Sequence, residues 1–78
     1  MTFAEELRKI SAGNEKAAIS FEARITGHPE EKILRGCLRE ALYGRRCMSF
    51  GRNILLPKSL IEQGLHLRSM GPGFECYW

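Results

Sequence analysis

The chain has 78 residues, 44% of them hydrophobic and 27% charged, a composition typical of one small globular domain. A domain of this size buries only about 60% of the surface that its unfolded chain exposes, so we expect a partner subunit or another staple. No apolar run reaches the roughly 20 residues that cross a bilayer. The acidic start MTFAEELRKI also lacks the apolar core of a signal peptide, so we expect a cytoplasmic protein without membrane contact.

The net charge of +3 comes entirely from the second half of the chain. Residues 1–40 carry equal numbers of basic and acidic side chains. Residues 41–78 carry two acids, Glu62 and Glu75, against five basic residues: Arg45, Arg46, Arg52, Lys58 and Arg68. A basic excess of this size attracts either nucleic acid or an acidic protein surface.

The first predicted element is a helix that runs from Thr2 to residue 25. Its apolar residues recur at helical spacing, and Thr2 with Glu5 forms a capping box at its start. Gly13 lies inside this stretch and is expected to kink the helix, although SAGN is also consistent with a break. AISFEARIT alternates as a strand does, which leaves a strand over residues 18–26 as another alternative.

A continuous helix of about 24 residues would span about 36 Å, whereas a compact domain of this length has a radius of gyration of about 11–12 Å. Part of the apolar stripe must then face another molecule, which predicts a homodimer. Asn14 falls on the same seam, where a single asparagine can fix the register of paired helices. The candidate interface residues are Phe3, Leu7, Ile10, Asn14, Ala17, Phe21 and Ile25.

The second predicted helix, from Pro29 to Tyr43, is the core helix. Gly27 suits the end of the preceding element and Pro29 the first turn of the new one, while Gly44 ends it. One continuous face is apolar, formed by Ile33, Leu34, Cys37, Leu38, Ala41 and Leu42.

The remaining residues predict a small antiparallel sheet. RCMSF is a short strand, LPKSLIEQG a two-turn helix, and two alternating arms on either side of SMGPG form a hairpin. Phe74, Cys76 and Trp78 share one face and are expected to pack on the core helix, at Leu34, Leu38 and Leu42, with Tyr77 on the opposite face. The fold class is therefore α+β, a single domain over residues 1–78, in which 1–26 is the oligomerisation element and 29–78 is the core.

No pattern in the chain indicates catalysis or a cofactor. Phosphate-binding glycine loops and the serine nucleophile elbow are both absent from the sequence. The three cysteines, Cys37, Cys47 and Cys76, form no C-x-x-C pair and have apolar neighbours, and His28 and His66 do not have zinc-ligand spacing to them. We therefore expect buried, reduced, metal-free thiols and a protein that is not an enzyme.

Two kinds of binding protein remain. The order helix, strand, helix, hairpin approaches that of a winged-helix nucleic-acid-binding domain, with Arg52, Lys58, His66 and Arg68 as contacts. Because these residues are scattered and SMGPG has no basic side chain, any nucleic-acid binding is expected to be weak. The other hypothesis is a module that binds proteins, with partner-binding candidates Arg45, Arg46, Arg52, Lys58, His66, Arg68 and Tyr77.

The second hypothesis gains from a resemblance carried by LREALYGRRCMSF, LIEQGLHL and FECYW, over about residues 30–78. A helix ending in Ala-Leu-x-Gly, a short strand, Leu-x-x-x-Gly-Leu-x-Leu and a closing strand ending in tryptophan resembles small accessory proteins of bacteriophages and prophages. The chain departs from them in GHPEE, where such proteins often have uninterrupted charged helix. The resemblance implies a non-catalytic factor that binds and inhibits or redirects a host or defence protein, and it transfers no functional residues.

Overall fold

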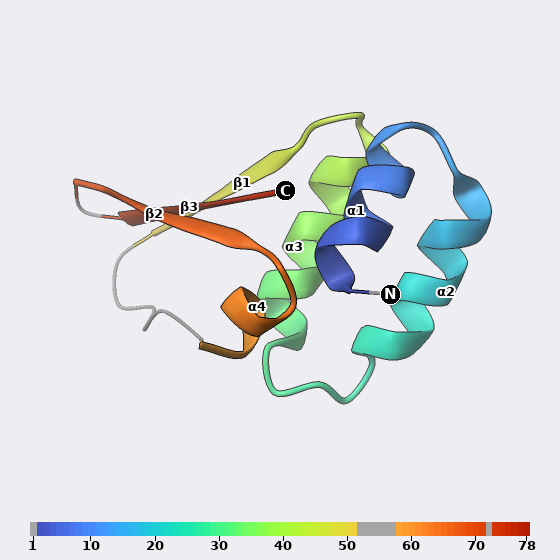
Figure 1. Cartoon of the computed structure of the whole chain (residues 1–78), viewed down its shortest axis with the longest axis horizontal. Coiled ribbons are helices and arrows are strands. Elements are labelled where there is room, and N and C mark those ends of the chain that lie inside the picture. Colours follow the sequence, from blue (N-terminus) through green and yellow to red (C-terminus); the bar gives the residue numbers. More distant parts are fainter. Residues whose placement is uncertain (1, 52–57, 72) are drawn as a thin grey trace.

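The computed structural model describes residues 2–51, 58–71 and 73–78 and has the α+β class expected from the sequence. Its elements in chain order are α1 (Phe3–Ser11), α2 (Glu15–Ile25), α3 (Glu31–Leu42), β1 (Cys47–Phe50), α4 (Lys58–Glu62), β2 (His66–Met70) and β3 (Gly73–Tyr77). Figure 1 shows the strands gathered at one end of the molecule, α2 at the other end, and α1 and α3 between them. The core helix and the hairpin are confirmed, with boundaries shifted by one or two residues.

The N-terminal stretch is two helices, so the prediction of one continuous helix to residue 25 is wrong. Gly13 has a φ of +98°, a left-handed conformation that glycine adopts without strain. It interrupts the helix between α1 and α2. Asn14 then caps α2, since its side-chain oxygen accepts the N–H of Ala17 at 3.1 Å. Asn14 is thus a helix cap, and the register role expected of it at an interface is wrong.

The apolar stripe of the two helices is buried inside one chain. Because α1 and α2 fold back on each other and pack on α3, their large apolar side chains lie in the same cluster as those of the core helix, namely Phe3, Leu7, Ile10, Phe21 and Ile25. Ala17 packs against this cluster while partly buried. The apolar stripe therefore does not require a second copy of the chain, and α1 and α2 belong to the core and are not an element apart from it. The homodimer itself stays a prediction.

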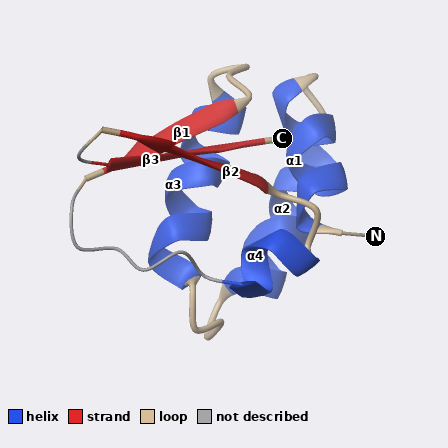
Figure 2. Ribbon diagram, turned by 60° about the vertical axis from the view of Figure 1, so that its left-hand side comes forward, coloured by secondary structure: helices blue, strands red, loops and turns tan. Residues whose placement is uncertain are grey.

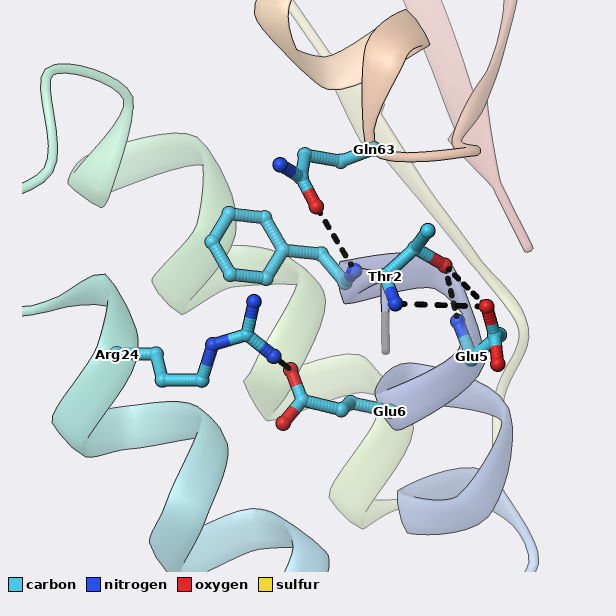
Figure 3. Close-up of polar contacts among 6 residues, drawn as sticks. Thr2, Glu5, Glu6, Arg24 and Gln63 are labelled. Atoms are coloured by element: carbon cyan, nitrogen blue, oxygen red, sulfur yellow. Dashed lines mark hydrogen bonds and ion pairs between the residues drawn. The ribbon is translucent and has the colours of Figure 1, made fainter.

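Charged and polar groups hold α1 against α2 and α4, as Figure 3 shows. The carboxylate of Glu6 is buried, and Arg24 of α2 donates to it while its guanidinium lies 4.8 Å from the centre of the Phe3 ring. Gln63, just after α4, accepts the N–H of Ala4 at its main-chain oxygen and that of Phe3 at its side-chain oxygen. The predicted capping box of Thr2 and Glu5 is present, and its hydrogen bonds lower the pKa of Glu5.

The sheet is antiparallel, with strand order β1-β3-β2, so the last strand is central (Figure 2). Cys76 of β3 lies opposite Met48 of β1 and Leu67 of β2, and Tyr77 lies opposite Cys47 and His66. Met70 pairs with Gly73, so the strands extend further into SMGPG than expected. This register decides which side chains share a face.

One face of the sheet packs on α3, as predicted for the closing strand. Cys76 and Trp78 are buried together with Leu34 and Leu38, and Phe74 is partly buried. The indole N–H of Trp78 donates to the Ser11 hydroxyl at 2.9 Å. Leu42 was assigned to this contact wrongly: it is 60% exposed at the end of α3, where it lines a hollow with Ile10 and residues 13–15 at the link between α1 and α2.

Candidate functional site: the outer face of the sheet

The face of the sheet that points away from α3 is open, and we call it the outer face. Side chains alternate across a strand, so the register places two rows of three residues there. One row is Cys47, Tyr77 and His66, and the other is Ser49, Glu75 and Arg68. All of them are exposed except Glu75, which is partly exposed.

The first row contains an aromatic pair. The rings of His66 and Tyr77 stack with their centres 5.1 Å apart and their planes 22° apart. Tyr77 is 38% exposed although it sits on the central strand. The pair therefore presents an exposed aromatic surface that also carries the hydrogen-bonding groups of an imidazole and a phenol.

The second row contains an ion pair. Arg68 Nη2 lies 2.9 Å from Glu75 Oε1, across the β2–β3 pair. The side chain of Arg68 is 60% exposed and that of Glu75 is 19% exposed, so the cation is the group that a partner would meet first.

Two arginines lead into β1 beside the outer face, and both are exposed. Arg46 is bonded to the end of the neighbouring strand β3, since its Nε donates to the main-chain oxygen of Trp78 at 3.0 Å. Arg45 Nη1 donates to Glu40 Oε2 at 2.7 Å, and this hydrogen bond raises the pKa of Arg45. The guanidinium of Arg45 also lies 5.6 Å from the ring centre of Tyr43, which is 75% exposed.

The structure thus brings together most of the partner-binding candidates. His66, Arg68 and Tyr77 lie on the outer face, with Arg45 and Arg46 at its border. Lys58 is exposed at the start of α4, off this face, and Arg52 lies outside the described residues.

Sequence reasoning missed several residues of this region: Arg39, Tyr43, Cys47, Ser49 and Glu75. The signal for Cys47 and Ser49 was their alternation with Met48 and Phe50 in RCMSF, which places the two pairs on opposite faces. Cys47 was expected to be buried, and it is exposed because it falls on the outer face.

A hollow of about 310 Å³ adjoins the outer face at β1. Its lining comes from two elements and the link between them: Arg39, Glu40, Arg45, Cys47, Met48 and Ser49. A larger hollow of about 550 Å³ is lined, within the described ranges, by residues 29–33 alone, at the start of α3. The smaller one is of more interest, because both α3 and β1 contribute to its lining and two arginines, Arg39 and Arg45, are among the residues that line it.

The cysteines are free, but two of them are neighbours. A hydrogen bond between Cys37 and Cys76, together with burial, raises the pKa of the Cys37 thiol, which stays protonated. The fold thus places two of the three thiols, from α3 and β3, next to each other. Among residues 2–51, 58–71 and 73–78, no three His, Cys, Asp or Glu side chains form a group that could hold a metal ion. The absence of a metal stays a prediction.

Comparison of the chain with protein-family models, with curated proteins and with solved structures gave no match. No helix in the described part of the chain is both long and apolar enough to span a membrane.

Proposed function

We propose that the chain is a small non-catalytic binding protein whose outer face docks on another protein. The observation that carries the proposal is the stacked pair of His66 and Tyr77, exposed to solvent at one end of a sheet whose other face is core. Tyrosine and arginine are the residue types that most often dominate the energy of protein interfaces. Here Tyr77 lies on β3, next to the strand β2 that carries Arg68, and it is close to the arginines that precede β1.

The resemblance to phage and prophage accessory proteins extends this proposal to the kind of partner. A host or defence protein would be bound in a one-to-one complex and thereby inhibited or redirected. Such a role needs no catalytic group, and it suits a domain whose surface chemistry is aromatic and cationic rather than that of an enclosed pocket.

Nucleic acid is the second candidate partner, favoured by the cationic groups at positions 45, 46 and 68. Two observations weigh against it. The helix before the hairpin, α4, has five residues, too few to fill a major groove as a recognition helix does. Arg68, the arginine of the outer face, is already paired with Glu75. We expect only weak binding that falls steeply with salt.

Affinity capture from a bacterial lysate, with and without nuclease, tests the proposal. We expect the wild type and Ile19→Ala to capture a protein whether or not nuclease is added. Tyr77→Ala should not capture it. Ile19 is the matched control because it is also a large exposed side chain, 73% exposed, but lies on α2 at the other end of the molecule (Figure 1). Recovery of nucleic acid alone, or capture that is equal for both variants, would contradict the proposal.

A further inference from the structure

The strand β1 has an open edge. Within the described residues, β1 pairs with β3 on one side and has no strand on the other (Figure 2). The N–H of Trp78 donates to the main-chain oxygen of Arg46 at 3.0 Å, so Arg46 and Trp78 form a hydrogen-bonded pair at the start of this ladder. In an antiparallel ladder such pairs alternate with pairs that are not hydrogen-bonded. The main-chain groups of Met48 and Phe50 therefore face β3, and those of Cys47 and Ser49 face outward.

Cys47 and Ser49, which carry these outward groups, both line the hollow described above. Two N–H and two C=O groups are thus presented at the spacing of a strand, about 7 Å from one residue to the next but one. This arrangement is one that another extended chain can complete.

The hollow is cationic. Among its described lining residues there is one carboxylate, that of Glu40, and it is bonded to Arg45. Arg39, on the last turns of α3, is exposed and forms no ion pair with any described residue. With Arg39 and Arg45 against Glu40, the hollow has an excess of positive charge, so it favours an acidic group.

We propose that an extended, acidic segment of a protein partner adds to the edge of β1, with its main chain paired to Cys47 and Ser49 and a carboxylate beside Arg39 and Arg45. Strand addition supplies affinity through main-chain hydrogen bonds, and a carboxylate meeting guanidinium groups supplies specificity. The inference rests on the proposed function, since the partner is a protein. It also deepens it, because Cys47 and Ser49 carry their side chains on the outer face and make the two surfaces continuous.

The anisotropy of fluorescently labelled peptides, titrated with the purified protein, tests this directly. The peptides have about eight residues, long enough to cover β1. The probe is a peptide that alternates Glu and Val. Three comparisons accompany it: the Lys-Val peptide, the Glu-Val peptide with an N-methyl group on every amide, and an oligothymidine. We expect the Glu-Val peptide to bind, and each of the other three to bind at least about tenfold more weakly.

Protein variants locate the site. Ser49→Pro removes an outward N–H from β1, and Ser69→Pro removes the corresponding outward N–H from β2 at the other edge of the sheet, where proline is tolerated. Arg39→Glu reverses a charge in the hollow, and Lys9→Glu reverses one at the end of α1. We expect Ser49→Pro and Arg39→Glu to weaken the Glu-Val peptide by about tenfold or more and both controls to leave it unchanged.

Equal binding of the N-methylated peptide, or equal loss with Ser49→Pro and Ser69→Pro, would overturn the inference. Tighter binding of the oligothymidine would do so in favour of nucleic acid. If Ser49→Pro does not fold, as shown by thermal melting, the N-methylated peptide on wild-type protein decides the matter. If the peptide does not bind but a captured protein partner depends on Tyr77, the edge of β1 is not the binding site and the proposed function is unaffected.

Discussion

The two faces of the sheet differ in burial although they are built from neighbouring residues of the same strands. Trp78 is buried and Tyr77 is exposed, and both are aromatic residues at the end of the chain. What separates them is the alternation of β3 and the presence of α3 on one side only. Residue type alone would have assigned both to the core. The period of the strand, combined with the helix that covers it, separates the residue that stabilises the fold from the one available to a partner.

The largest expected effect is on the inner face. Trp78→Ala should lower the free energy of unfolding by about 3–5 kcal/mol, a large share of the 5–15 kcal/mol typical of a whole domain. It removes a buried ring and leaves the Ser11 hydroxyl without its donor. Thermal or urea unfolding measures it. A melting curve like that of the wild type, with loss of the partner, would show that Trp78 is an interface residue instead.

Gly36→Ala should be the next in size, because the inner face is tightest there. A Cβ at this position would lie 2.1 Å from Met48 Sδ, so the thioether of Met48 must move out of its place against α3. We expect a net loss of about 1–2 kcal/mol, the cost of overpacking less the gain in helix propensity.

A double-mutant cycle provides the control for Gly36. In a Met48→Ala background the clash is gone, and Gly36→Ala should stabilise the protein by about 0.5–1 kcal/mol through helix propensity alone. The same loss in both backgrounds would mean that Met48 does not set the packing at this point.

On the outer face, Tyr77→Ala should cost about 1 kcal/mol or less, the energy of a cross-strand aromatic pair. Unfolding of Tyr77→Ala, His66→Ala and the double variant isolates the stacking energy. Partner capture should be lost in the same variant. A stability loss as large as that of Trp78→Ala would abolish the distinction between the faces.

The smallest effect belongs to the ion pair of the outer face. Glu75→Gln should change the free energy of unfolding by about 0.5 kcal/mol or less, since Arg68 is well exposed and the pair is screened by water. The difference should shrink further in 1 M salt. A cost above about 1 kcal/mol that persists in salt would show that this pair helps to hold the sheet together.

Sequence periodicity predicted the elements of the fold more successfully than it predicted their packing. The core helix, the hairpin and the face of Phe74, Cys76 and Trp78 follow from spacing alone. The break at Gly13 does not, because one glycine is consistent with either a kink or a stop, and only the packing of α1 on α2 selects the stop. The prediction of an interface at residues 3–25 followed directly from that ambiguity.

The candidate site was predictable only in part. His66, Arg68 and Tyr77 could be picked out from the polar positions of the hairpin arms. Their union with Cys47 and Ser49 depends on β1 pairing with β3 across more than 20 intervening residues, which no local pattern specifies. For the same reason the contact between Cys37 and Cys76, from two distant elements, could not be inferred.

The missing side chain at position 36 has a consequence beyond stability. Met48 fills the notch that Gly36 leaves in α3, and Met48 also lines the hollow in which Arg39 and the edge of β1 meet. The width of that hollow therefore depends on how closely the thioether of Met48 packs against α3. A single methyl group added at position 36 would act as a spacer between helix and strand. We expect it to retune what the edge of β1 accepts while leaving every residue that touches the partner unchanged.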